Sequence, residues 1–552
     1  MPNVEVLLGD EAVGLAALHS RIGGAFSYPG TPATEIFEFI SRHAEPERHV
    51  SARWSANEKV AFEEALGMSY AGRRAIVSMK HVGLNVAADP FMSSALTGVH
   101  GGLVLAVADD PGMHSSQNEQ DSRFYADFAR IPLFEPCSQQ ECYDLTRVAF
   151  DWSERIGLPV MVRLVTRVAH SRADVRLSPE ARDDSLPRMP EKPDWTQWTL
   201  LPPNARKRYR RLLDLQATLR DETERSPFNR LTLSGKRGII ASGLAYNYVR
   251  EALGGDTSFS LLKLSAYPIP ENLVRRLVDH CEEIFVIEEG YPFIESRLTG
   301  LLGLPGKAVR GRLSGHIPAA GELNPDIVAA ALGFASAQTT AVPTEPLSAR
   351  PPQLCRGCPH ADTFKAIVAA AAPFSQAALF SDIGCYTLGA YPPFNAVHAC
   401  VDMGASIAMS HGAAQAGAFP VICTIGDSTF AHSGMTALIG AARHDADMTV
   451  VVLDNGYTAM TGQQDSLATG DALIQLLLGL GVRREHLAEI EPVPRNHGRN
   501  VEVLTEAIQH RGLSVVVAKR VCIQAKRREG RPSEQADVAP CGAVCEGCGA
   551  VV

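Results

Sequence analysis

Two predicted strands, Val421–Ile425 and Met448–Leu453, are each followed by a residue whose side chain can bind a metal ion. The first strand runs into Asp427 and the second into Asn455. The carboxyl ends of parallel strands meet at one edge of an open sheet, and such folds bind ligands there. Carboxylate and amide oxygens, with the backbone carbonyl of Tyr457 as a third ligand, suit a Mg²⁺ ion that bridges to a diphosphate. The spacing therefore predicts a magnesium and diphosphate site.

Neighbouring residues extend this prediction toward a particular cofactor. Gly426 lets the backbone approach a ligand closely, and Gly404 and Ala405 stand at a predicted helix start, where backbone amides can bind phosphate. The whole pattern resembles the thiamine-diphosphate signature, although Ser428 and Asp454 depart from its strict form. A Gly-Asp pair alone is more often an ordinary turn. Because both presumed ligands are kept at the right spacing, we predict that thiamine diphosphate binds here.

A carboxylate that protonates the pyrimidine ring is the second requirement of this cofactor, since the protein supplies position and electrostatics while the cofactor supplies the chemistry. Glu58 stands at the start of a helix predicted over 58–72. Ala61, Ala65 and Gly67 follow it and would form a small, packed face. The alternative is an exposed glutamate that the helix dipole favours. With the magnesium motif in the same chain, we predict that Glu58 holds the pyrimidine.

Four cysteines in or just beyond the same region could bind an inorganic cluster. They are Cys355, Cys358, Cys385 and Cys522. Four thiolates can hold a [4Fe–4S] cluster. Zinc, a redox dithiol or structural thiols are the alternatives that the C-x2-C spacing leaves open. A thiamine enzyme that transfers electrons needs a nearby acceptor, which favours the iron–sulfur cluster.

The other cysteines fall into two groups. Three lie in the C-terminal tail and could hold a second cluster with an outside ligand, or remain free thiols in a disordered tail; they are Cys541, Cys545 and Cys548. Five lie in apolar surroundings and are predicted to be core residues; they are Cys137, Cys142, Cys281, Cys400 and Cys423.

The composition of the 552 residues excludes several classes of protein. Hydrophobic residues make up 45% and charged residues 20%, as in globular domains rather than disordered chains. A net charge of −9 argues against a nucleic-acid partner. The basic run 206–211 could be a phosphate-binding patch, but such a run is more often a solvated helix face. The chain shows no signal-peptide pattern and no apolar run long enough for a membrane span. Twelve cysteines are too few for a disulfide scaffold, so we expect a cytoplasmic protein.

Six longer motifs, spread over residues 1–525, carry a family resemblance. They are Tyr28–Glu35, Ser78–Pro90, Met113–Asp121, Cys355–His360, Ile383–Ala390 and Asn455–Gln463. Together they resemble the 2-oxoacid:ferredoxin oxidoreductases, and most of all the α subunits that act on indolepyruvate. The resemblance implies oxidative decarboxylation of an aryl-2-oxoacid with coenzyme A, which yields an acyl-CoA, CO₂ and electrons for ferredoxin. A non-oxidative thiamine-dependent decarboxylase is the alternative, and such enzymes lack the clustered cysteines.

The resemblance also implies roles for individual residues and a partner. Thr31 would lie near the substrate oxygen and Glu58 at the pyrimidine, while Asp427, Asn455 and the Tyr457 carbonyl would bind magnesium. The four cysteines of the central set would carry the proximal [4Fe–4S] cluster. A smaller β subunit would complete a hetero-oligomeric enzyme.

Three further expectations concern the substrate and the path of electrons. Met460 stands near a position where pyruvate-using relatives carry asparagine, which predicts a more apolar pocket. His81, His114 and Gln117 are either substrate-loop contacts or structural residues. The α subunit of this family typically ends in a ferredoxin-like domain with cysteines for two clusters. This chain has only three cysteines there, so its route for electron exit departs from the pattern.

We predict a multidomain α/β protein of transketolase-like parallel sheets covered by helices, because strands alternate with helical patterns along the chain. At about 150 residues per domain, its length suggests three or four domains. The predicted parts are a pyrimidine-binding domain (1–175), a helical, basic connecting segment (176–235), a domain like the C-terminal domain of transketolase (236–335), a linker (336–352), a diphosphate- and magnesium-binding domain with the proximal cysteines (353–525) and a cysteine-bearing tail (526–552).

Overall fold

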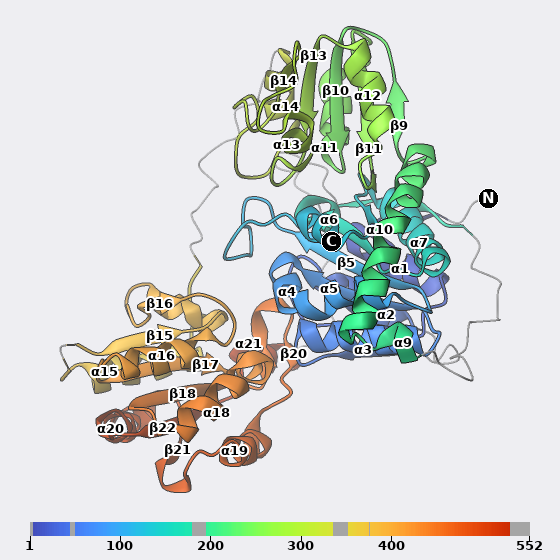
Figure 1. Ribbon diagram of the computed structural model, residues 1–552. Helices are drawn as coiled ribbons and strands as arrows, with labels where there is room; N and C mark the ends of the chain where they lie inside the picture. Colours follow the sequence, from blue (N-terminus) through green and yellow to red (C-terminus); the bar gives the residue numbers. More distant parts are fainter. Residues whose placement is uncertain (1–3, 45–49, 179–194, 335–351, 375, 530–552) are drawn as a thin grey trace. The chain divides into compact units, whose positions relative to one another are not determined.

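The structure is a computed structural model that describes residues 4–44, 50–178, 195–334, 352–374 and 376–529 (Figure 1). The chain divides into two compact units, residues 1–342 with 538–552 and residues 343–537. Each unit contains mainly parallel sheets covered by helices, so the predicted α/β class is confirmed. The domain boundaries remain predictions. Residues 336–351 of the predicted linker and the three tail cysteines lie outside the described residues.

A seven-stranded sheet with the order β12-β6-β7-β5-β4-β2-β3 forms the base of the first unit. Its strands are β2 (Gly24–Ser27), β3 (Ser51–Trp54), β4 (Ala75–Lys80), β5 (Leu103–Asp109), β6 (Leu133–Phe134), β7 (Val160–Val165) and β12 (Ala266–Tyr267). Every neighbouring pair is parallel except β12 and β6, which are antiparallel. The edge strand β12 thus comes from beyond residue 235, where the connecting segment was predicted to end.

Helices follow these strands and cover both faces of the sheet. They are α1 (Gly9–His19), α2 (Thr34–His43), α3 (Glu58–Tyr70), α4 (His81–Val86), α5 (Ala88–Thr97), α6 (Arg123–Ala129), α7 (Gln139–Ile156) and α8 (Thr166–His170). A separate antiparallel pair joins β1 (Val4–Leu8) to β8 (Arg172–Arg176). Strands β4 and β5 are buried almost throughout, as expected for parallel strands with helices on both sides.

A five-stranded sheet with the order β14-β13-β10-β11-β9 completes the first unit. Its strands are β9 (Arg230–Thr232), β10 (Arg237–Ser242), β11 (Phe259–Leu264), β13 (Glu283–Ile287) and β14 (Ala308–Arg310), and its helices are α11 (Ala245–Leu253), α12 (Glu271–His280), α13 (Phe293–Thr299) and α14 (Pro325–Leu332). Helices α9 (Trp195–Trp198) and α10 (Pro202–Arg225) precede it. The basic run lies on α10 and is largely exposed, in line with a solvated helix face.

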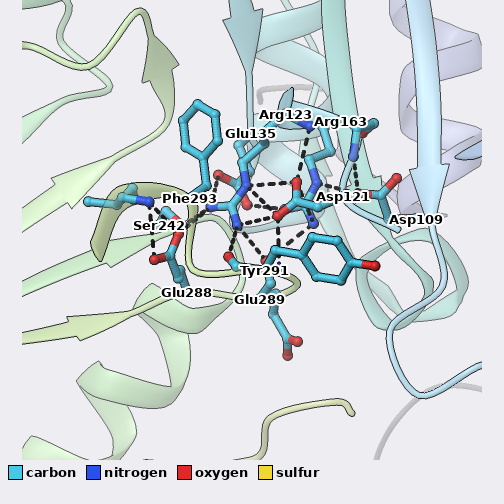
Figure 2. A network of polar contacts seen from close by, with 12 residues as sticks. Asp109, Asp121, Arg123, Glu135, Arg163, Ser242, Glu288, Glu289, Tyr291 and Phe293 are labelled. Carbon is cyan, nitrogen blue, oxygen red and sulfur yellow. Dashed lines mark hydrogen bonds and ion pairs between the residues drawn. The ribbon is translucent and has the colours of Figure 1, made fainter. Parts of the chain in front are cut away.

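Two fully buried arginines join the two sheets of this unit (Figure 2). Arg123 donates to Asp121 in its own segment and, at 2.9 Å, to Glu288, which directly follows β13. Arg163 in β7 donates at 2.6 Å to Asp109 at the end of β5. Buried charges are stable only when they are paired and hydrogen-bonded. This network therefore fixes the ends of β5, β7 and β13 relative to one another.

A six-stranded, fully parallel sheet with the order β16-β15-β17-β18-β22-β21 forms the second unit. Its strands are β15 (Ala378–Ser381), β16 (Ala399–Cys400), β17 (Val421–Gly426), β18 (Met448–Asp454), β21 (Leu487–Ile490) and β22 (Leu513–Lys519). Its helices are α15 (Pro359–Ala371), α16 (Ala405–Gln415), α17 (Asp427–Thr429), α18 (Met435–Arg443), α19 (Gly470–Gly479), α20 (His497–Gln509) and α21 (Ile523–Glu529). A short pair, β19 (Tyr457–Thr458) and β20 (Gln464–Asp465), follows β18.

The alternation of side chains along the central strands produces two separate cores. In β18, Val450 and Val452 pack on the side of α16, α18 and α19, whereas Val451 and Leu453 pack on the side of α15 and α20. Successive strand residues point to opposite faces, so a run that is apolar at every position requires helices on both.

One predicted core cysteine differs from the others. Cys137, Cys142, Cys281 and Cys423 are buried, but Cys400 is only partly buried. It lies at the end of the two-residue edge strand β16, which has a neighbour on one side only. Within the described part of the chain, no helix combines the length and hydropathy that a membrane crossing requires.

Candidate active site

The predicted site residues fall into two groups, one in each unit. In the second unit, Asp427 and Asn455 follow the adjacent parallel strands β17 and β18. The Asp427 carboxylate accepts hydrogen bonds from the amides of Ser428 at 2.6 Å and Gly456 at 2.8 Å. The Asn455 side-chain oxygen accepts from the amide of Tyr457 at 2.9 Å. The two strand ends are therefore joined directly, and their oxygen-bearing side chains are buried together.

The orientation of the Asn455 amide is set by a histidine that sequence reasoning did not single out. His360 is fully buried, and burial lowers its pKa to about 4, so its ring is neutral near pH 7. Its Nε2 accepts from the Asn455 nitrogen at 3.0 Å. Because the nitrogen is engaged by the histidine, the Asn455 oxygen is presented on the opposite side. The only signal in the sequence is that His360 ends the CRGCPH motif.

The donor set at these strand ends fits a hard divalent cation. Asp427 is a buried carboxylate that forms no ion pair with any described cation, and burial followed by the charge of Asp454 raises its pKa to about 7. A bound cation would reverse that shift. Carboxylate, amide and carbonyl oxygens from Asp427, Asn455 and Tyr457 are ligands that Mg²⁺ accepts. Asp454 itself is engaged elsewhere, since it accepts from the amide of Gly470 at the start of α19.

The predicted phosphate cradle at the start of α16 already contains a carboxylate. Gly404 precedes the helix with a φ of 93°, a conformation that favours glycine. The amide of Ser406 donates to Asp382 at 2.8 Å, and the Ser406 hydroxyl donates to the same carboxylate. Burial raises the pKa of Asp382 to about 6. A diphosphate at Gly404 and Ala405 would therefore share this helix start with Asp382.

The four central cysteines are close enough to influence one another's ionisation. Burial and then Cys358, Cys522 and Cys355 raise the pKa of Cys385 to about 12. Cys355 and Cys358 lie in the turn before α15, where the Cys358 amide donates to the Cys355 carbonyl at 3.0 Å. Cys385 begins a short 3₁₀ helix, and Cys522 follows β22. The structure thus brings together four residues that are distant in the sequence.

The spacing of these thiols bears on the choice between zinc and a cluster. Among the described residues, the group of three or more ligand atoms within 4.8 Å of one another contains no cysteine. Zinc–sulfur bonds of about 2.3 Å would hold the sulfurs of a single zinc site within about 4.6 Å of one another. No three of the described cysteine sulfurs therefore lie as close together as a single zinc site would hold them.

In the first unit, Glu58 is the first residue of α3 and is buried. Asn57 caps this helix and accepts from the amide of Val60 at 2.9 Å. The Glu58 carboxylate lies against Gly83 of α4, because a Cβ placed on Gly83 would be 2.6 Å from the Glu58 Oε1. The glycine therefore makes room for the glutamate.

The predicted small face of α3 is only partly correct. Ala61 and Ala65 are fully buried, whereas Gly67 is exposed and a Cβ there would have nothing within 4 Å. At 3.6 residues per turn, positions three and seven after Glu58 lie near its own face, but position nine lies on the opposite side of the helix.

Thr31 and a lysine that sequence reasoning missed lie at the same edge of the seven-stranded sheet as Glu58. The carbonyl of Thr31 accepts from the Ser115 hydroxyl at 3.1 Å, and Lys80 at the end of β4 donates to the Ser115 carbonyl at 3.3 Å. Burial lowers the pKa of Lys80, although the negative charges of Asp110 and Glu58 act to raise it. The sequence feature that could have indicated Lys80 is its position as a charged residue at the end of a predicted buried strand.

The remaining candidates differ in their surroundings. His81 is buried, and its Nε2 lies 3.1 Å from the carbonyl of Asn118. His114 lies 3.5 Å from Glu322, and Gln117 is exposed. Met460 is 61% exposed, so its own unit does not enclose it in an apolar pocket.

A cavity of about 790 Å³ lies among α6, α10, α12 and α13. Arginines and apolar side chains line it together, and it contains none of the predicted site residues. This cavity is thus separate from the residues that carry the predicted chemistry.

Comparison with known families matches both groups of residues. A family described as thiamine pyrophosphate enzyme, C-terminal TPP binding domain, matches residues 382–518, which include Asp427 and Asn455. A second, described as pyruvate flavodoxin/ferredoxin oxidoreductase, thiamine diphosphate-binding, matches residues 16–211, which include Thr31 and Glu58. Fold and site together define a thiamine-diphosphate-binding oxidoreductase of the 2-oxoacid:ferredoxin class.

Relatives that align with almost the whole chain identify one family within this class. The indolepyruvate oxidoreductase subunits IorA of Archaeoglobus fulgidus and Methanothermobacter thermautotrophicus are each 39% identical, over 95% of this chain and 88% of theirs. The IorA subunit of Thermococcus kodakarensis is 38% identical over 94% of this chain and 85% of its own. The chain belongs to the IorA family of indolepyruvate oxidoreductase subunits, and the resemblance seen in the sequence is confirmed.

Proposed function

We propose that this chain catalyses the oxidative decarboxylation of an aryl-2-oxoacid of the indolepyruvate type. The 2-oxoacid and coenzyme A are converted to an acyl-CoA and CO₂. The two electrons released pass through a [4Fe–4S] cluster to ferredoxin. A β subunit completes the enzyme as a hetero-oligomer, which we place in the cytoplasm.

The observation that supports this proposal most is the direct contact between the cation site and the cysteine set. The carbonyl of Asn455 accepts from the amide of Cys522 at 3.0 Å, and its side chain bonds to His360, two residues after Cys358. Asn455 is thus hydrogen-bonded to Cys522, a predicted cluster ligand, and to His360, which lies close in sequence to the predicted ligand Cys358. A cofactor whose diphosphate is held here would lie near the cluster, so the electrons released by decarboxylation would have a nearby acceptor.

Each group of residues has a defined task in this scheme. Thiamine diphosphate, when bound, supplies the carbanion chemistry that removes CO₂ from a 2-oxoacid. Asp427, Asn455 and the Tyr457 carbonyl would hold its magnesium ion, and the backbone at Gly404 and Ala405 would hold phosphate. Gly426 and Ser428 flank Asp427 and shape the same strand end.

The first unit supplies the proton chemistry. The buried Glu58 carboxylate would hold a proton at the pyrimidine ring, and Asn57 together with Gly83 fixes where that carboxylate lies. Thr31 would position the substrate oxygen. Lys80, on the same sheet edge, adds a positive charge close to where the substrate carboxylate would bind.

An anaerobic assay of the chain with its β subunit tests the proposal. Indolepyruvate, coenzyme A and a viologen dye are supplied, and dye reduction, acyl-CoA and iron content are measured. We expect dye reduction that depends on coenzyme A and about four iron atoms per cluster. Cys358→Ser should lose the iron and the dye reduction, whereas Cys400→Ser, a partly buried cysteine outside the set, should keep both.

The same assay separates the alternative function. Release of CO₂ from indolepyruvate without dye reduction, in a protein without iron, would identify a non-oxidative decarboxylase and overturn the proposal. Loss of all turnover in Asp427→Asn with iron retained would show that the cation site and the cluster are separately required.

A further inference from the structure

Three helices of the first unit bring together three side chains that could bind a metal ion, and none of the three has a role in the proposed active site. Asp10 lies in the first turn of α1, Glu35 in the first turn of α2, and His170 ends α8. One ligand atom from each lies within 4.8 Å of the other two. The His170 Nε2 is 3.3 Å from the Glu35 carboxylate. No motif in the sequence indicated this grouping, because the three residues are far apart in the chain.

The Asp10 carboxylate is the unusual member of the set. Its side chain is fully buried, and neither oxygen has a hydrogen-bond partner among the described residues. Burial, together with the nearby charges of Glu35 and Glu11, holds the pKa of Asp10 well above its usual range. An unpaired buried carboxylate is costly unless a proton or a cation satisfies it.

We propose that Asp10, Glu35 and His170 bind one divalent transition-metal ion of the zinc type. Two carboxylates and one imidazole match the ligands that zinc accepts, and three protein ligands leave a position for water. Glu35 and His170 are about one-third exposed, at 37% and 33%, so the ion could enter from the solvent side with Asp10 at the buried end.

The neighbouring acidic residue, Glu11, has partners of its own and does not belong to the set. Glu11 is adjacent to Asp10 in the same helical turn, but it accepts from the amide of Leu8 at 2.8 Å and pairs with Arg172 at 3.4 Å. Its carboxylate is therefore already engaged by other groups. Glu11→Gln thus provides a matched control that removes an acidic group without removing a ligand.

A metal ion at this position would join three helices that pack closely. The start of α1 approaches α8 so tightly that a Cβ on Gly9 would be 2.2 Å from the carbonyl of Val168. The ion would therefore act as a structural clamp at the N-terminal edge of the first unit.

Zinc binding and thermal unfolding of the full chain test the proposal without an activity readout. The protein and the variants Asp10→Asn, Glu35→Gln, His170→Gln and Glu11→Gln are prepared anaerobically and stripped of loosely bound metal. Zinc is then titrated by calorimetry and counted by mass spectrometry. Tryptophan fluorescence follows unfolding, since Trp54, Trp152, Trp195 and Trp198 all lie in the first unit.

We expect the parent chain and Glu11→Gln to bind about one zinc equivalent more than each ligand variant. Zinc should raise the unfolding temperature of the first unit in these two proteins only, because a ligand that binds the folded state stabilises it. Zinc bound by the cysteines of the second unit is common to all five proteins and cancels in the comparison.

Two outcomes would overturn the proposal. Equal zinc content and equal stabilisation in all five proteins would show that the set does not bind the ion. A higher unfolding temperature for Asp10→Asn with no response to zinc in the parent chain would show that Asp10 and Glu35 share a proton instead. If Asp10→Asn does not fold, the partly exposed Glu35→Gln gives the same comparison.

Discussion

The Glu58 carboxylate can occupy its buried position only if residue 83 carries no side chain. The structure leaves room for it only because residue 83 has no Cβ. Glycine inside a helix such as α4 is normally less favourable than alanine. The glycine at this position is therefore explained by the glutamate that it accommodates rather than by the helix to which it belongs.

Gly83→Ala should consequently reduce turnover. We expect at least a tenfold loss, corresponding to about 1.4 kcal/mol of transition-state stabilisation, because the new methyl group displaces the carboxylate that holds the pyrimidine proton. Gly67→Ala is the control: the position is open, and alanine should stabilise α3 by about 0.5–1 kcal/mol with activity unchanged. Anaerobic dye-reduction assays and fluorescence-detected unfolding measure the two effects. Equal activities of both variants would contradict this assignment.

Met460 gives a second prediction at the scale of a residue. Replacement by asparagine should lower the turnover of indolepyruvate more than that of pyruvate, since it removes an apolar side chain. The residue is largely exposed, so the free energy of unfolding should change by less than about 0.5 kcal/mol. The ratio of kcat/KM for the two substrates is the measurement, and an unchanged ratio would refute the hypothesis.

At the scale of elements, the strands were the part that the sequence predicted best. Runs such as Leu103–Ala108 and Val450–Leu453 are apolar at every position, which is the pattern of a strand covered on both faces. The carboxyl ends of Val421–Ile425 and Met448–Leu453 were expected to meet at the ligand-binding edge of one sheet. Asp427 and Asn455 could therefore be placed together from the sequence alone. Contacts between distant elements could not be predicted in this way, and these include the pairing of Gly83 with Glu58 and of Asn455 with His360.

The buried arginines that join the two sheets lead to a prediction about elements. Arg123→Leu should destabilise the first unit by about 3–5 kcal/mol, because it leaves the Glu288 carboxylate buried without its cation and removes one of the two arginines that pair with Asp121. Arg155→Leu removes an exposed arginine paired with Glu222 and should cost less than about 1 kcal/mol. Denaturant unfolding followed by tryptophan fluorescence compares the two. A similar midpoint for both variants would show that the network does not hold the sheets together.

The pH dependence of stability belongs to the whole first unit. Burial raises the pKa of Glu289 from 4.5 to about 7. Between these values the folded state binds more protons than the unfolded state, so this group makes stability fall as the pH rises from about 4.5 to 7. Glu289→Gln removes this effect. Its advantage over the parent chain should be small at pH 5 and approach at most about 3 kcal/mol at pH 8.

Glu283 provides a control of opposite sign. Burial alone would raise the pKa of this carboxyl, but hydrogen bonds to Arg310 and Arg237 and their positive charges lower it. Its stabilising contribution is therefore present above the unfolded pKa and lost as the pH falls through the folded value. Glu283→Gln should reduce stability at pH 8, where Glu289→Gln increases it. Unfolding midpoints that show no difference between the two variants across this range would contradict the pKa assignments.

The antiparallel strand β12 has a consequence for how this protein is made. The first large sheet takes its last strand from residues 266–267, long after its other six strands have been encoded. During translation the edge of β6 stays unpaired until Tyr267 has left the ribosome. An unpaired strand edge can pair with other chains and so promotes aggregation. A gene cut at residue 235 would yield a polypeptide that keeps this edge open permanently, so it should accumulate as aggregates rather than as a free-standing domain.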